Sequence, residues 1–227
     1  LGDLYPDQET PTIHDESTHI EQMRGEVPVA EARAGNLSQV DAHFFNGIIL
    51  RAMNEGLADV WGWIYSGDND FVAKSIPEES SRKIGLPMEA VTATEVLRAQ
   101  ISAGIRYSES HDKNFNPSWY SYNVGTQLAR AIKGMSEEMT RKNEPMTKSE
   151  KQQFAKALIQ SLSSIKERVA ALAKGEYLSP VVVLEALSEQ LIVADNANSK
   201  ICDRLLRYVD SRDQKELVSC LKVTDTP

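Results

Sequence analysis

Residues 146–175, MTKSEKQQFAKALIQSLSSIKERVAALAKG, decide the fold class of this chain. Apolar side chains follow one another there at every third or fourth position, which places them on one side of an α-helix. They are Ala155, Leu158, Leu162, Ile165, Val169 and Leu172. Thr147 and Glu150 have the spacing of a capping box, and Gly175 can take the left-handed conformation that closes a helix. The stretch therefore predicts an amphipathic helix of about seven turns.

The same spacing of apolar residues recurs through most of the chain. It predicts helices over residues 38–54, 57–65, 89–107, 119–142, 180–194, 198–209 and 211–222, with a short one at 78–84. We expect Ser38, together with Asp41, to cap the first of these helices, and Gly56 to end it. The β-branched run that begins at Val181 follows Ser179-Pro180, which is a typical helix start. The predicted fold class is all-α, a bundle of about seven to eight helices.

The acidic residues are concentrated at the amino end. Residues 1–31 hold eight Asp or Glu against one base, Arg24, so their net charge is −7; the other 25 acids and 24 bases leave −1 for the rest. Prolines, glycines and few large apolar residues predict that residues 1–37 form an extended or disordered acidic arm. If the arm is ordered, either its own body or a neighbouring copy holds it. Residues 38–227 are predicted to form a single all-helical domain, with a division into 38–143 and 146–227 as the alternative.

Composition excludes several classes of protein. No apolar run approaches the roughly 18 residues of a membrane span, so we expect a soluble chain. The near-neutral body lacks a dense basic footprint, which disfavours nucleic acid as a partner without excluding it. Neither Gly-x-Gly-x-x-Gly nor Gly-Lys-Ser/Thr occurs, and no cofactor is expected. Cys202 and Cys220 are interpreted as small, buried, reduced residues, because their spacing alone does not show that they pair.

The polar loop at residues 108–118 is the best candidate for a functional site. It combines His111 with an aromatic group that continues into the next helix, and loops carry a large share of binding residues. The candidate binding residues there are His111, Phe115, Trp119, Tyr120 and Tyr122. Trp61 and Trp63 are expected to face different sides of their helix, and together with Trp119 and Tyr120 they are predicted to form an aromatic binding patch.

A second candidate is basic. Arg141, Lys142, Lys148 and Lys151 gather at one helix junction, where an anion or the acidic arm of a neighbouring copy could bind. His14 and His19 do not have the spacing of a zinc site, so no metal ligands are assigned, and no catalytic residue is assigned either. Single glycines inside helices, at positions 47, 104, 125 and 134, predict close approaches between helices.

These features favour a non-enzymatic helical protein that works by protein–protein contact, as an adaptor, a secreted effector or an assembly subunit. Its partners would be another protein or copies of itself, bound through the aromatic surface and the acidic arm. Two alternatives stay open. One is a nucleocapsid or coat-type subunit that binds nucleic acid, and the other is a small helical enzyme that uses the loop around His111.

Overall fold

The computed structural model describes residues 40–75, 82–86, 90–139, 146–194 and 198–220, and within these ranges the chain is all-α. The described helices are α3 (Ala42–Ser66), α4 (Phe71–Ser75), α5 (Thr94–Ser110), α6 (Pro117–Met139), α7 (Lys148–Ala170), α8 (Val182–Ala194), α9 (Asn198–Tyr208) and the 3-10 helix η3 (Gln214–Glu216). The described residues contain no β-strand, only an isolated bridge between Val91 and Val209. The predicted arm, residues 1–37, lies outside them. None of the described helices is long and apolar enough to cross a membrane.

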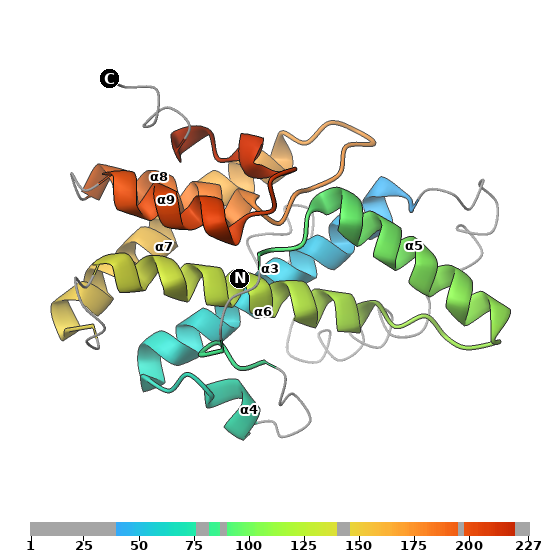
Figure 1. Cartoon of the computed structure of the whole chain (residues 1–227), viewed down its shortest axis with the longest axis horizontal. Coiled ribbons are helices and arrows are strands. Elements are labelled where there is room, and N and C mark those ends of the chain that lie inside the picture. Colours follow the sequence, from blue (N-terminus) through green and yellow to red (C-terminus); the bar gives the residue numbers. More distant parts are fainter. Residues whose placement is uncertain (1–39, 76–81, 87–89, 140–145, 195–197, 221–227) are drawn as a thin grey trace.

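The long helices α3 and α6 pack against each other at the centre of the molecule (Figure 1). Near their first turns, the Ser121 hydroxyl donates to the Ile48 carbonyl at 3.2 Å. Near their last turns, Lys133 Nζ lies 5.9 Å from the ring centroid of Trp63. The two helices therefore run in the same direction. Helices α8 and α9 pack on α6, and α7 packs on α8.

The predicted break at Gly56 is wrong, because α3 continues without interruption from Ala42 to Ser66. Gly56 instead lies where α6 crosses α3, and a Cβ atom at this position would lie 2.5 Å from the carbonyl oxygen of Gly125. The glycine is present to allow the close approach of two helices, and its helix propensity is overridden by the packing.

Local capping signals explain where two helices begin. Asp41 caps α3, its carboxylate accepting from the backbone N–H groups of His43 at 2.8 Å and Phe44 at 3.3 Å. The predicted cap at Ser38 lies outside the described residues. The capping box of Thr147 and Glu150 is confirmed at the start of α7. That helix ends at Ala170, earlier than predicted, and Gly175 takes its left-handed conformation, φ 89°, in the following loop.

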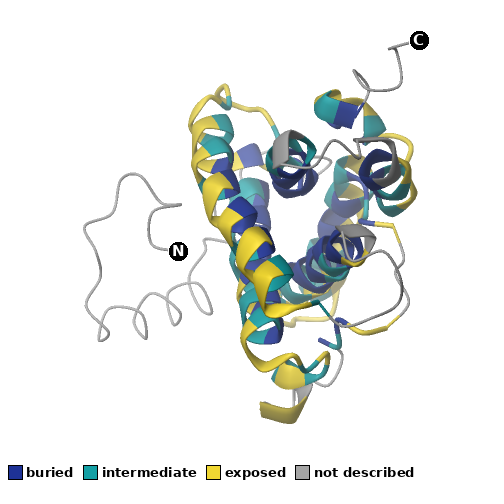
Figure 2. Ribbon diagram, turned by 90° about the vertical axis from the view of Figure 1, so that its left-hand side faces the viewer, coloured by how far each residue is buried: buried dark blue, intermediate teal, exposed yellow. Residues whose placement is uncertain are grey.

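The core lies between the helices, and their outer sides are exposed (Figure 2). Each of the long helices contributes fully buried apolar side chains to it, including α9 with Leu205. Examples are Phe45, Ile49, Met53, Leu57, Leu97, Leu128, Ile132, Phe154, Leu158, Val183 and Leu187. At about 1.5–3 kcal/mol for each large apolar side chain, this burial is the main force that holds the bundle together.

Two loop segments fasten the helices to one another over long sequence distances. The segment before α5 reaches the end of α9, where the Val91 N–H donates to the Tyr208 carbonyl at 2.7 Å. The loop between α7 and α8 reaches the start of α3, where the Tyr177 hydroxyl donates to the Val40 carbonyl at 2.7 Å. The start of the described chain and the end of α9 are therefore tied to other elements.

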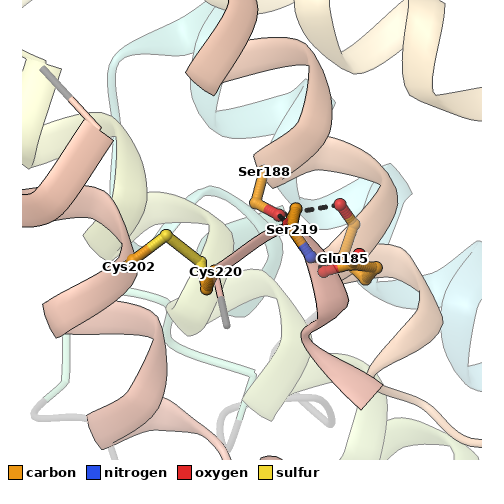
Figure 3. Close-up of a disulfide and its surroundings, with 5 residues drawn as sticks. All are labelled: Glu185, Ser188, Cys202, Ser219 and Cys220. Atoms are coloured by element: carbon orange, nitrogen blue, oxygen red, sulfur yellow. Dashed lines mark hydrogen bonds between the residues drawn. A yellow bond between two sulfur atoms is a disulfide. The ribbon is translucent and has the colours of Figure 1, made fainter. Parts of the chain in front are cut away.

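The prediction of reduced cysteines is wrong. Cys202 on α9 and Cys220 form a disulfide that spans 18 residues, with their Cα atoms 5.1 Å apart (Figure 3). Both side chains are buried, as predicted. Beside them, Ser219 donates its backbone N–H and its hydroxyl to the buried carboxylate of Glu185 on α8, at 2.9 and 2.7 Å. The cysteines can pair because the chain after η3 folds back onto α8 and α9, which their spacing does not reveal.

The remaining helix predictions differ from the structure in detail. The predicted helix at 211–222 is replaced by η3 and a short helical stretch that begins at residue 218. Most of the predicted helix at 78–84 lies outside the described residues, and α4 was not predicted. Close approaches occur at Gly104, Gly125 and Gly134, as predicted, whereas a Cβ atom at Gly47 would meet nothing within 4 Å.

Candidate functional site

The turn between α5 and α6 forms one corner of the molecule. Helix α5 ends at Ser110, and Asp112 takes a left-handed conformation, φ 50°, that reverses the chain. The Lys113 N–H donates back to the Ser108 carbonyl at 2.8 Å. Helix α6 then begins at Pro117, where the side-chain oxygen of Asn116 accepts from the Ser118 N–H at 3.0 Å. These bonds fix the loop that carries the candidate residues.

Four aromatic rings come together at this corner. The ring of Phe115 lies 6.0 Å from that of Phe44 and is stacked at 5.5 Å on that of Tyr120. Trp119 meets Tyr120 edge-on, with ring centroids 4.9 Å apart. Such arrangements contribute about 0.5–1.5 kcal/mol per pair beyond the burial of area. The sequence correctly predicted that Phe115, Trp119 and Tyr120 lie together, but it did not indicate that Phe44 joins them.

Tyr120 ties the aromatic group to α5. Its hydroxyl donates to the Gln100 carbonyl at 3.2 Å, and it lies against Gly104, where there is no room for a Cβ atom. Burial raises the pKa of the Tyr120 hydroxyl above its ordinary value of 10.0. The hydroxyl therefore stays protonated and keeps its role as a donor.

His111 lies at the carboxyl end of α5 with well-defined partners. Its Nδ1 is 2.8 Å from the Tyr107 carbonyl and 2.9 Å from the Ser110 hydroxyl, and its ring stacks on that of Tyr107 at 4.0 Å. Since a carbonyl can only accept, Nδ1 carries the proton and Nε2 is the acceptor of the neutral ring. Lys113 Nζ lies 5.8 Å from the centroid of the same Tyr107 ring. The carboxyl end of α5 therefore has polar and aromatic side chains on its outer face.

Two of these aromatic side chains are open to solvent. Trp119 is 60% exposed and Tyr107 is 54% exposed, whereas Phe115 and Tyr120 are partly buried against the core. We define the corner surface as Tyr107, His111, Lys113, Phe115, Trp119 and Tyr120. It presents two large exposed rings, Tyr107 and Trp119, with the imidazole of His111 and the ammonium group of Lys113 beside Tyr107.

The structure does not unite the predicted aromatic patch. Trp63 is buried and Trp61 is partly buried at the far end of α3, where Lys133 approaches Trp63. Lys133 follows Trp119 by four turns of α6, so roughly 20 Å separate the two groups. Spacing within one helix does not reveal which end of another helix lies beside it, and for this reason the sequence grouped them wrongly.

Tyr122 belongs to a different group of side chains. The guanidinium carbons of Arg51 and Arg82 lie 5.2 and 4.9 Å from the centroid of its ring. Arg51 also donates to the Tyr122 hydroxyl at 3.1 Å. The ring therefore organises two cations and is not part of the corner surface.

Sequence reasoning missed the buried ion pair beside that ring. Asp59 is 2% exposed and Arg82 is 7% exposed, and two nitrogens of Arg82 meet the two carboxylate oxygens of Asp59 at 3.2 and 2.5 Å. Glu55 joins them, with its carboxylate 2.9 Å from Arg82. Asp59 follows Ala52 and Gly56 at helical spacing on the side of α3 that meets α6. An acidic residue at such a position indicates a buried carboxylate that needs a cation as its partner, and this was the signal that the sequence offered.

The predicted basic site is only partly described. Arg141 and Lys142 lie outside the described residues. Lys148 is exposed, and Lys151 is partly buried at the carboxyl end of α3. A Cβ atom at Gly67, the C-cap residue of α3, would lie 3.6 Å from Lys151 Nζ. A cation is stabilised at the carboxyl end of a helix, which gives Lys151 a structural role.

No group of three residues that could hold a metal ion occurs among the residues with described positions; His14 and His19 lie outside them. Comparison of the chain with protein-family models, curated proteins and solved structures found no match.

Proposed function

We propose that this chain is a non-enzymatic protein-interaction protein that binds its partner through the corner surface. The observation that carries the proposal is the exposure of Trp119, whose side chain is 60% open to solvent while its ring is held edge-on against Tyr120. A Trp side chain on a rigid support loses little entropy on binding, and Trp is strongly enriched among the residues that anchor protein interfaces.

The chemistry of the corner surface indicates the kind of partner. Tyr107 and Trp119 offer apolar area. Beside Tyr107, Lys113 presents a donor and His111 presents an acceptor, its Nε2. A protein surface with an apolar centre and an acidic edge complements this arrangement, because interfaces combine a desolvated core with a polar rim. The partner is either another protein or a second copy of this chain.

The disulfide supports the secreted form of this proposal. Cys202 and Cys220 are bonded, and bonds of this kind persist mainly in oxidising compartments. A secreted effector therefore accords better with the structure than an adaptor of the reducing cytosol does. An assembly subunit outside the cytosol accords with it equally well.

The two other hypotheses receive less support. A catalytic base is usually set in a cleft that also holds the substrate, whereas His111 is exposed at a helix end with its ring stacked on that of Tyr107. A coat-type subunit would need many cations along a groove, whereas residues 32–227 carry 25 acids against 24 bases. Strongly salt-dependent RNA binding by the full chain would favour the coat-type subunit.

The proposal can be tested by site-specific photocrosslinking of the full chain. A benzoylphenylalanine replaces Trp119 in one variant and Tyr65 in the control, since Tyr65 is an aromatic residue at the carboxyl end of α3 that is 93% exposed. We expect position 119 alone to give a crosslinked species, either with purified chain or with a partner purified afterwards. Trp119→Ala should then weaken the measured affinity roughly tenfold or more, and Tyr65→Ala should not.

Equal crosslinking from both positions would contradict the proposal. So would an affinity that Trp119→Ala leaves unchanged. Crosslinking of purified chain to itself would identify the partner as a second copy.

A further inference from the structure

Within the described ranges, Arg98 is a cation without a carboxylate partner, and it lies near Val40, where the described fold begins. Its guanidinium carbon lies 3.5 Å from the ring centroid of Tyr177, and its buried Nε has no hydrogen-bond partner within the described ranges. The hydroxyl of the same Tyr177 donates to the carbonyl of Val40, the first described residue. Val40 therefore lies one side chain away from Arg98.

A second arginine of α5 lies on the same face. Arg106 follows Arg98 by eight residues, or about 12 Å along the helix, and donates to the hydroxyl of Ser102 between them at 2.7 Å. Arg106 is exposed, and among the described residues its only hydrogen-bond partner is this neutral hydroxyl. We define the α5 stripe as Arg98, Ser102 and Arg106.

The arm has the opposite charge and sufficient length. Its first 31 residues carry a net charge of −7, and Glu31 is nine residues before Val40. Nine extended residues span up to about 30 Å, which exceeds the length of the α5 stripe. Glu26 and Glu31 can therefore both reach it. An arginine that is already partly desolvated gains most from a carboxylate, because it can donate two parallel hydrogen bonds to it.

We propose that the acidic arm of this chain binds to the α5 stripe of the same chain, with Arg98 and Arg106 holding arm carboxylates. The arm ends three residues before Val40, which lies one side chain away from Arg98. Its local concentration at the stripe is therefore in the millimolar range, far above that of an arm from a second copy in dilute solution. This inference goes beyond the corner surface, which it does not require.

The arm contains its own reporters, because trypsin cleaves after Arg24 and Arg33. The experiment follows these two cleavages by mass spectrometry in the full chain at low salt. It compares the natural chain with the double variant Arg98→Gln, Arg106→Gln. The control is Lys156→Gln, Lys166→Gln, which removes the same charge from exposed positions of α7. We expect the arginine variant to be cleaved roughly fivefold faster or more, and the control to match the natural chain.

Further measurements keep the test decisive. Added salt should raise the cleavage rate of the natural chain toward that of the arginine variant, because ion pairs near the surface are screened. The single variant Arg106→Gln, at an exposed position, should give part of the effect with an unchanged melting temperature. Equal rates in all variants would overturn the proposal. An arm-dependent dimer in sedimentation experiments would also overturn it, by assigning the arm to a second copy.

Discussion

Gly56 of α3 and Gly125 of α6 face each other where the two helices cross. A Cβ atom on Gly56 would lie 2.5 Å from the Gly125 carbonyl oxygen, and one on Gly125 would lie 2.7 Å from the Ala52 carbonyl oxygen. Both neighbours are backbone atoms, which cannot move aside as a side chain can. The two backbones therefore approach as closely as they do only because both positions lack a side chain.

We predict that Gly56→Ala lowers the free energy of unfolding by about 1–3 kcal/mol, since the added methyl group forces α3 and α6 apart. Gly47→Ala is the matched control in the same helix, where a Cβ atom meets nothing within 4 Å. It should raise the free energy of unfolding by up to about 1 kcal/mol, through helix propensity alone. Urea denaturation measures both. Equal stability of the two variants would show that α3 and α6 do not approach each other closely at Gly56.

The pair of Asp59 and Arg82 predicts a non-additive result. Asp59→Ala leaves the Arg82 charge buried, and loss of one partner of such a pair costs about 3–5 kcal/mol. The double variant Asp59→Leu, Arg82→Met replaces both buried charges by apolar groups and should recover much of that loss, because Glu55, the remaining charge, is partly exposed and keeps Arg51 at 3.9 Å. Denaturation of the single and double variants checks this. Losses that simply add would mean that the two side chains do not act as a pair.

The disulfide makes stability depend on redox conditions. The variant Cys202→Ala, Cys220→Ala should lose about 2–4 kcal/mol of unfolding free energy, because the bond closes a loop of 18 residues in the unfolded chain. Dithiothreitol should lower the stability of the natural chain by a similar amount and leave the variant unchanged. Alkylation of the unreduced, unfolded chain should label no thiol. Two labelled thiols in chain purified under oxidising conditions would contradict the bond.

The sequence predicted what depends on neighbours along the chain. The capping box of Thr147 and Glu150 and the apolar spacing of α7 lie within one segment, so pattern alone located that helix. The adjacency of Phe115, Trp119 and Tyr120 likewise gave the centre of the corner surface. Local patterns were sufficient there because all the partners lie within two turns of one another.

Features that depend on tertiary contact were missed or predicted wrongly. Gly56 resembled a helix end because its partner, Gly125, belongs to another helix. Trp61 was grouped with Trp119 although the parallel packing of α3 and α6 separates them. Cys202 and Cys220 pair only after the chain has folded back on α8 and α9. None of these approaches leaves a mark in the spacing of residues.

Glu216 predicts how stability changes with pH. Burial raises the pKa of its carboxyl above the ordinary value of 4.5, although a hydrogen bond from Ser179 opposes the shift. The folded pKa is therefore above the unfolded one, so the ionised carboxylate destabilises the folded state at neutral pH. This penalty disappears as the pH falls below 4.5.

Accordingly, Glu216→Gln should raise the melting temperature at pH 7 and leave it unchanged at pH 3. The exposed Glu167 on α7 supplies the control, Glu167→Gln, which should show no gain at pH 7. Calorimetry at the two pH values provides the comparison. A gain of equal size at both would show that ionisation of Glu216 is not the cause.

Asp213 caps α5 from a distant part of the chain. The cap position of α5 is Ala93, which has no side chain able to accept, and the Asp213 carboxylate instead accepts from the Thr94 N–H at 2.8 Å and from its hydroxyl at 2.9 Å. We predict that Asp213→Ala costs about 1 kcal/mol, the usual value of a lost helix cap, and speeds hydrogen exchange in the first turn of α5. Asp213→Asn keeps an acceptor and should retain most of the protection. Thr94→Ala should retain it too, because the backbone bond survives. Fast exchange in all three variants would mean that α5 is held by its buried Leu97 and Ile101 alone, and that the cap contributes nothing.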